Sequence, residues 1–234
     1  MARMSRRFSQ VREKVDREKR YSLEESCQLV KELATAGFDE TVEVAVCLNV
    51  NPKYADQMIR GSCILPNGTG KEVRVAVFAT GDRAEQAREA GADVVGDEDL
   101  AGRIQEGWLE FDVVIASPDM MRIVGKLGRV LGPRGLMPNP KTGTVTDNVA
   151  EAVREAKSGK ISFRVDKTGN LHVPVGKASF DQQALAENII SFYEKVLQLK
   201  PSSVKGQYLK NLSVSSTMGP GIKIDFNDLR ARIR

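Results

Sequence analysis

Residues 211–226, NLSVSSTMGPGIKIDF, form two short alternating segments on either side of a glycine–proline turn. Leu212 and Val214 alternate with serines in the first segment, and isoleucines alternate with charged residues in the second. This period of two is typical of strands that bury one face. Pro220 lacks a backbone N–H and cannot continue a central strand, so the pattern predicts a strand, an exposed loop and a second strand.

The loop of residues 216–221 presents hydroxyl groups, free backbone N–H groups and one methionine. Hydroxyls and N–H groups suit phosphate and ribose oxygens, and a soft apolar side chain suits a base or a sugar face. Loops of this composition are also common in ordinary surface hairpins, so that alternative stays open at this point.

Other segments of the outer parts of the chain also show the alternation typical of antiparallel strands. Residues 41–50 alternate cleanly between apolar and other side chains, which predicts a strand whose second face is open to solvent or to a partner. Residues 161–165 and 170–175 alternate as well, and the turn DKTG at 166–169 between them predicts a hairpin with glycine in the left-handed position.

Helices are predicted around these strands from capping residues and apolar stripes. Residues 1–20 form a short basic amphipathic segment, and a capping box at Ser22 opens a helix that ends near Gly37. A long helix follows residue 179 and stops before Pro201. Shorter helices are predicted from Asn51 to Gly61 and at residues 204–209.

The middle of the chain has a different pattern of predicted secondary structure. Apolar strands at 73–78, 92–95 and 111–116 alternate with helices, the last two of which cover 118–131 and 148–157. Strands alternating with helices predict βαβ units and a parallel sheet covered on both faces. The economical architecture is one domain inserted into another: residues 67–159 lie within a discontinuous domain of residues 1–66 plus 160–234, and the two glycine-containing linkers predict a hinge. A single three-layer domain is the alternative.

Charge divides along the same boundaries. The net charge is +4, but residues 1–66 carry 11 Lys and Arg against 10 Asp and Glu, residues 67–159 carry 12 against 15, and residues 160–234 carry 12 against 6. The two ends of the chain are therefore basic together. A one-sided basic field indicates a polyanionic partner, with a solvated lysine surface as the plainer interpretation.

Several classes of function find no support in the sequence. No apolar run approaches the roughly 20 residues of a membrane span, and the charged N-terminus is not a secretory signal. Cys47 and Cys63 lie in apolar runs, are predicted to be buried thiols, and indicate a reducing cytoplasm. With His172 as the single histidine we expect no metal site. No cofactor is expected, because the βα turn at 79–82 lacks both nucleotide-binding glycine patterns.

A second candidate nucleic-acid contact lies in the middle region. Residues 125–143 are rich in glycine and proline, which predicts a long irregular loop, with a rigid surface loop of no function as the alternative. Residues 120–146 contain no acidic side chain. The basic side chains of this stretch are Arg122, Lys126, Arg129, Arg134 and Lys141.

Four motifs of the chain resemble the family of large ribosomal subunit protein one, the stalk protein beside the tRNA exit site. They are GKLGRVLGPRGLMPNPKTGT (125–144), STMGPG (216–221), DKTGNLHVPVGKASF (166–180) and LPNGTGKEVRVAVFA (65–79). The resemblance runs in register over nearly the whole chain and looks bacterial. It implies a split-sheet α+β domain interrupted by a Rossmann-like α/β domain, in a protein that is cytoplasmic, ribosome-associated and a monomer within the ribosome.

The resemblance also implies partners and contact residues. The partners are large-subunit rRNA, the mRNA of the protein's own operon, whose translation it represses, and deacylated exit-site tRNA, whose release it assists. The implied RNA-binding residues are Phe38, Glu40, Thr41, Lys167, Thr168, Gly169, His172, Ser213, Ser215, Thr217, Met218, Gly219 and Pro220. The family often has threonines at the positions of Ser215 and Ser216, and the hydroxyl survives here.

The residues and the resemblance together predict a non-enzymatic RNA-binding protein. Without a set of exposed aromatic residues, the open sheet face suggests recognition of a folded RNA through its backbone and ribose hydroxyls. Two alternatives belong to other classes: a Rossmann-like nucleotide-binding enzyme with an RNA-binding domain, and a protein-interaction scaffold.

Overall fold

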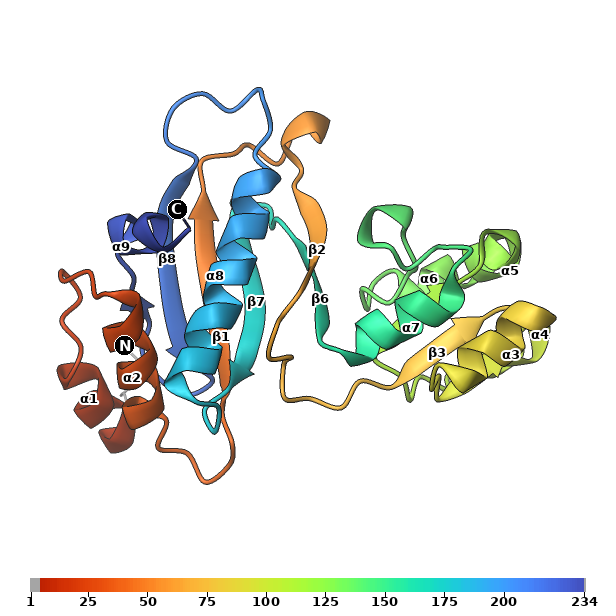
Figure 1. The fold of residues 1–234 in the computed structure, drawn as a ribbon, viewed down its shortest axis with the longest axis horizontal. Helices are drawn as coiled ribbons and strands as arrows, with labels where there is room; N and C mark the ends of the chain where they lie inside the picture. The colour runs from red at the N-terminus through yellow and green to blue at the C-terminus, as the bar shows by residue number, and fades with distance from the viewer. Residues whose placement is uncertain (1–4, 234) are drawn as a thin grey trace. The chain divides into compact units, whose positions relative to one another are not determined.

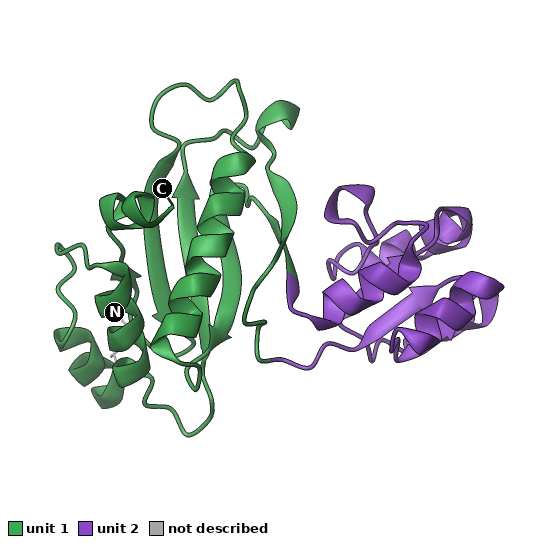
Figure 2. Ribbon diagram, in the orientation of Figure 1, with its two compact units in different colours: residues 1–70, 161–234 green, residues 71–160 purple. Residues whose placement is uncertain are grey.

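The computed structural model describes residues 5–233, which form two compact units (Figures 1 and 2). Unit 1 comprises Met1–Gly70 and Ile161–Arg234, and unit 2 comprises Lys71–Lys160. The first four residues of the basic N-terminal segment lie outside the described part of the chain. The chain thus leaves unit 1 once and returns to it once.

A four-stranded antiparallel sheet is the centre of unit 1, in the order β7-β1-β8-β9 (Figure 1). Its strands are β1 (Thr41–Leu48), β7 (Asn170–Lys177), β8 (Leu209–Ser216) and β9 (Ile222–Lys223). β8 and β9 pair directly, so the predicted strand, loop and strand at 211–226 are confirmed. Residues 216–221 join them as the loop.

Helices cover one face of this sheet and leave the other open. α2 (Leu23–Leu33) and α8 (Gln182–Gln198) are the two covering helices (Figure 1), and the valines of β1 are buried beneath them. The capping box of α2 is confirmed: Glu25 N–H donates to the Ser22 hydroxyl, and Ser22 N–H donates to the Glu25 carboxylate. Two shorter helices, α1 (Arg6–Glu13) and α9 (Phe226–Arg232), flank the sheet, and α9 was not predicted.

The predicted hairpin at 161–175 is wrong. β6 (Lys160–Arg164) pairs with β2 (Arg60–Ile64) in a separate two-stranded sheet, whereas β7 pairs with β1. The turn at 166–169 therefore passes the chain from one sheet to the other. Local alternation is the same in either case, and the choice of partner strand depends on residues about a hundred positions away.

Two predicted short helices are also wrong. Between β1 and β2 the chain has only a single 3₁₀ turn, η1 (Ala55–Gln57), and Gly61 lies within β2. A Cβ at Gly61 would lie 2.6 Å from Leu199 Cδ1, so this glycine allows close packing and does not end a helix. Residues 204–207 are not helical, and β8 has begun by Leu209.

Unit 2 is built on a parallel sheet in the order β4-β3-β5. Its strands are β3 (Val75–Phe78), β4 (Val94–Gly96) and β5 (Val113–Ala116). α3 (Asp82–Glu89) and α7 (Val149–Lys157) cover one face, and α4 (Glu98–Gln105) with the helical segment of residues 118–131 covers the other. Successive residues of β3 enter opposite cores, which confirms a sheet buried on both faces.

The segment of residues 118–131 is a series of short turns and not one helix. It runs through η2 (Pro118–Met120), α5 (Met121–Val124), η3 (Gly125–Leu127) and α6 (Gly128–Leu131). The predicted irregular loop at 125–143 is therefore helical in its first third. It is irregular from residue 132 until η4 (Pro140–Thr142).

All three cysteines are free thiols, but Cys47 is only half-buried and lies on the open face of β1, so the prediction of a buried Cys47 is wrong. Among the described residues, no group of His, Cys, Asp or Glu side chains is arranged to hold a metal ion. In the same part of the chain, no helix is both long and apolar enough to span a membrane.

Candidate nucleic-acid interface

The loop between β8 and β9 is fastened to the start of β1 by Thr217. The Thr217 hydroxyl accepts a hydrogen bond from Thr41 N–H at 3.0 Å and donates one to Thr41 C=O at 3.2 Å. Val42 pairs with Ser216 in the sheet, so the hydroxyl extends the β1–β8 ladder by one further step. The side chain of Thr217 therefore holds the loop in place although the residue is exposed. The N–H groups of Met218 and Gly219 are hydrogen-bonded within the protein, so the prediction of free backbone N–H groups is wrong at these two residues.

Glu40 is the second residue that fastens this loop. It is 1% exposed, and its two carboxylate oxygens accept hydrogen bonds from Met218 N–H at 2.8 Å and from Ala36 N–H at 3.0 Å. Burial would raise the pKa of this carboxyl, but these N–H groups and the Arg7 guanidinium outweigh burial and leave the pKa below its ordinary value. Glu40 thus joins the loop before β1 to the loop after β8.

Arg7 of α1 makes a second bridge between the same two loops. Its guanidinium donates to Met218 C=O at 3.3 Å and to the Thr35 hydroxyl at 3.1 Å. The backbone of Met218 is consequently held on both its N–H and its C=O side. What remains available to a ligand is the Met218 side chain, which is 47% exposed.

Phe38 is the other apolar side chain displayed at this end of the sheet. It is 56% exposed and lies in the loop between α2 and β1, which the Glu40 and Arg7 contacts tie to Met218. Gly219 follows Met218 in the loop between β8 and β9, and a Cβ there would lie 2.5 Å from the Ser216 hydroxyl oxygen. This end of unit 1 therefore presents two apolar contacts on a tightly packed backbone.

The open face of the sheet carries a row of small and polar side chains. In one row across the strands, His172 of β7 lies beside Ala45 of β1, Ala45 beside Ser213 of β8, and Ser213 beside Lys223 of β9. In the next row Ser215 lies beside Glu43. His172 is exposed and both serines are half-buried, so this face offers hydrogen-bonding groups to a ligand.

The turn of residues 166–169 lies at the opposite end of the sheet. Its Asp166 carboxylate accepts hydrogen bonds from the N–H groups of Asn170 and Thr168, which lowers the pKa of Asp166 to about 2. Gly169 C=O accepts a hydrogen bond from Leu48 N–H at the far end of β1. Lys167 and Thr168 project into solvent from this turn.

The implied RNA-binding residues of the sequence therefore fall into three groups on unit 1. Those around Thr217 lie at the Thr41 end of β1, those around Lys167 lie at the Leu48 end, and the remainder lie on the open face between. The seven residue steps of β1 separate the two ends by about 23 Å, at roughly 3.3 Å per residue. Glu40 is the member whose side chain is turned inward.

Two residues that hold this region together were not predicted from the sequence. Arg7 was seen only as one of many charges in a basic segment, although its helical spacing from the buried Val11 signals that it sits near the covered side. Lys177 pairs across from Thr41 and donates to its hydroxyl at 2.9 Å. Only the strand register reveals this contact.

The five basic residues of unit 2 that were predicted as a second nucleic-acid contact are all exposed. They lie on the helical segment and on the irregular loop that follows it. Hydrogen bonds fix the end of this loop. The Asn139 carbonyl accepts one from the Thr142 hydroxyl at 3.0 Å, and the Thr144 hydroxyl bonds to both of these groups. This is a fixed cationic surface on an otherwise acidic unit.

The chain is similar to known proteins over most of its length. The chain matches the Ribosomal protein L1p/L10e family over residues 30–220. It is 60% identical over 226 residues to "Large ribosomal subunit protein uL1" of Thermosipho africanus. The match covers 96% of this chain and 97% of that protein. The protein of the same name from Thermosipho melanesiensis is 59% identical over the same shares of the two chains.

Proposed function

The chain belongs to the ribosomal protein L1p/L10e family, and on that premise we propose that it holds large-subunit rRNA at the stalk through the open sheet face of unit 1 and the loops at its two ends. Membership makes the chain a structural protein of the large ribosomal subunit, associated with the ribosome in the cytoplasm. The enzyme alternative is wrong for the same reason.

The observation that carries the RNA surface is the bracing of the 216–221 loop. Thr217, Glu40 and Arg7 together make six hydrogen bonds within unit 1 that connect this loop to residues 35–41 and to α1. A loop held in its binding conformation loses little conformational entropy when a ligand arrives, which favours tight and selective binding. The polar row between the two ends supplies groups suited to ribose hydroxyls and phosphates.

The same surface is proposed to bind the mRNA of the protein's own operon. A surface that reads backbone and ribose positions accepts any RNA that presents the same folded shape. The two RNAs therefore compete for unit 1, and occupation by mRNA represses translation of that message. A folded mRNA element is expected to displace rRNA fully and not partially.

Exit-site tRNA is proposed to contact unit 2 through its basic surface. Arg122, Lys126, Arg129, Arg134 and Lys141 are exposed and have no acidic neighbour in the sequence between residues 120 and 146. Lysine and arginine side chains neutralise phosphates without selecting a base sequence. Such a contact suits the release of many different deacylated tRNAs.

The test compares the full chain with a variant in which residues 71–160 are replaced by a short glycine linker. Both are titrated with a stalk-junction rRNA fragment, and the same fragment is then displaced with the operon mRNA. We expect the shortened protein to keep most of its rRNA affinity, because the proposed contacts all lie in unit 1. Loss of binding by a shortened protein whose circular dichroism and cooperative unfolding are intact contradicts the proposal.

A further inference from the structure

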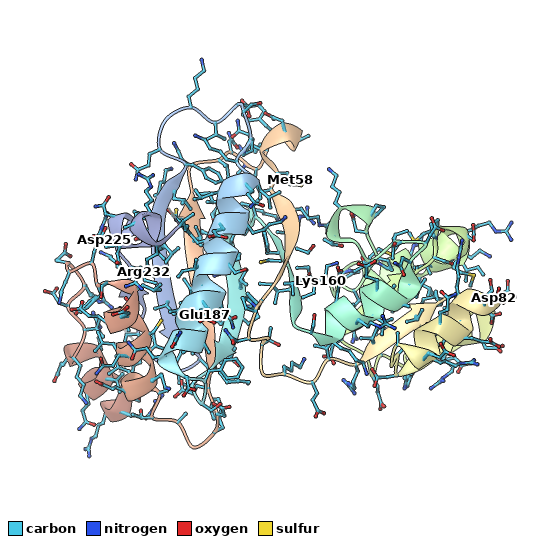
Figure 3. All side chains as sticks on the ribbon, viewed as in Figure 1. Met58, Asp82, Lys160, Glu187, Asp225 and Arg232 are labelled. Carbon is cyan, nitrogen blue, oxygen red and sulfur yellow. The ribbon has the colours of Figure 1, made fainter. Side chains whose placement is uncertain are left out.

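The segment between β1 and β2 displays two large apolar side chains that the interface described above does not use. Tyr54 is 59% exposed and Met58 is 44% exposed. Figure 3 labels Met58 near the top of unit 1, on the segment that leads into β2. Single exposed apolar residues are ordinary, but an aromatic ring and a thioether on one short loop form a displayed surface.

This loop is fixed by its own hydrogen bonds. Asn51 C=O accepts from Tyr54 N–H at 3.1 Å, and Tyr54 C=O accepts from Gln57 N–H at 3.1 Å. The Gln57 side-chain oxygen in turn accepts from Asn51 N–H at 2.8 Å, and the Asn51 side chain accepts from Lys53 N–H at 3.2 Å. The loop therefore closes on itself and presents Tyr54 on a defined backbone, although the ring packs on no core.

The loop lies at the same end of the sheet as the turn of residues 166–169. Val165 N–H donates to Ile59 C=O at 3.0 Å, and the Arg164 guanidinium contacts Met58 Sδ at 3.5 Å. Leu48, which precedes the loop, donates to Gly169 C=O at 2.9 Å. Tyr54 and Met58 thus extend the interface past the Lys167 end of β1.

Positive charges outnumber negative ones on the loop and the segments beside it. Lys53 and Arg60 lie on or next to the loop in sequence and Arg164 contacts Met58, against Asp56; Lys167 and Asp166 belong to the neighbouring 166–169 turn. The Asp166 carboxylate is occupied by the N–H groups of its own turn, which reduces its effect on a ligand outside the turn. An aromatic ring among cations that reach phosphates is the arrangement that binds unpaired nucleotides.

We propose that Tyr54 stacks on an unpaired base of the bound rRNA while Lys53 and Arg164 contact the phosphates beside that base; this inference rests on the proposed function. Stacking accepts any base because every base has a π-face, so this contact adds affinity and not sequence preference. Met58 covers the edge of the stacked base. The positive surroundings favour RNA over an apolar protein partner.

The test titrates full-length Tyr54→Ala and Tyr54→Phe with the stalk-junction rRNA fragment across a salt series. Truncation to alanine is expected to weaken binding roughly 5- to 150-fold, whereas phenylalanine keeps the stacking and binds within about twofold of the unaltered chain. The salt slope stays unchanged in both, because no charge is removed. Lys53→Gln and Arg164→Gln are each expected to reduce the slope by about 0.7 to 0.9.

Ile64→Ala is the matched control, because Ile64 is 44% exposed on β2 of the same unit and lies outside the proposed contact. It is expected to bind like the unaltered chain. If the unaltered chain prefers the fragment over a scrambled duplex but Tyr54→Ala binds equally well, the stacking inference fails alone. If the unaltered chain shows no preference, the proposed function fails and the inference with it.

Discussion

At the scale of single residues, two side chains of the proposed RNA surface form their hydrogen bonds within the protein. Thr217 and Glu40 were inferred as ligand contacts from the family resemblance, yet their hydrogen bonds go to the backbone of Thr41, Met218 and Ala36. Their effect on RNA is therefore exerted through the position of the Met218 loop. Beside this loop, Met218 and Phe38 are the exposed apolar side chains that a ligand can touch.

Thr217→Ala tests this positioning role. The change removes both hydrogen bonds to Thr41, so we expect rRNA binding to weaken by about 1–3 kcal/mol through a loosened loop. Thr217→Ser keeps the hydroxyl and is expected to bind almost normally. Titration with the rRNA fragment measures both, and equal losses in the alanine and serine variants would contradict the role of the hydroxyl.

Glu40→Gln tests the buried carboxylate by its pH dependence. An amide cannot accept two N–H groups without placing its own NH₂ against one of them, so we expect a loss of roughly 1–3 kcal/mol in unfolding free energy at pH 7. The pKa of Glu40 is lowered in the folded chain from a reference of 4.5, so its stabilisation is present above pH 4.5 and is lost as the pH falls through the lower folded value.

The difference between the unaltered chain and Glu40→Gln should therefore be constant near neutrality and shrink below pH 4.5, as measured by denaturant unfolding. Glu43→Gln is the control, because Glu43 is exposed on the same strand and its change is expected to stay within about 0.5 kcal/mol. A difference that does not depend on pH would show that packing, and not charge, explains the effect.

At the scale of elements, α1 helps to hold the loop of residues 216–221 in place. Its Arg7 reaches both Thr35 and Met218, and Lys223 of β9 donates to Arg17 C=O at 2.7 Å, which ties the chain after α1 to the same edge of the sheet. The basic N-terminal segment therefore contributes to the fold of the interface, beyond contributing charge.

Arg7→Ala is expected to weaken rRNA binding by about 1 kcal/mol, because one charge-assisted hydrogen bond to the loop is lost. Arg6→Ala removes the same charge from an exposed neighbour on α1 and is expected to have less effect. Equal losses in both variants, measured by titration at one salt concentration, would indicate that α1 acts through its net charge alone.

Local patterns of the sequence predicted most elements, and non-local pairing explains the errors. The capping box of α2, the alternation of β1 and the loop after β8 each depend on neighbouring residues, and all three are confirmed. The hairpin at 161–175 failed because β6 and β7 each prefer a distant partner strand. Which residues lie at each end of β1 likewise follows from strand pairing, which alternation does not specify.

At the scale of the whole molecule, the interface residues lie in unit 1 and the second basic surface lies in unit 2. A chain whose two units carry different contacts can hold one RNA while it meets another. That the linkers act as a hinge stays a prediction. The deletion of residues 71–160 described above tests whether unit 1 binds rRNA without unit 2.

The most direct test of the central claim is binding of the purified chain to a stalk-junction rRNA fragment and to a scrambled duplex of equal length, across a salt series. A braced, hydrogen-bonding surface predicts tight binding of the fragment alone, with a salt slope smaller than the number of nearby cations would give. Equal affinity for both RNAs with a steep salt slope would contradict the account, because it would mean that the basic ends of the chain act only as a charged patch.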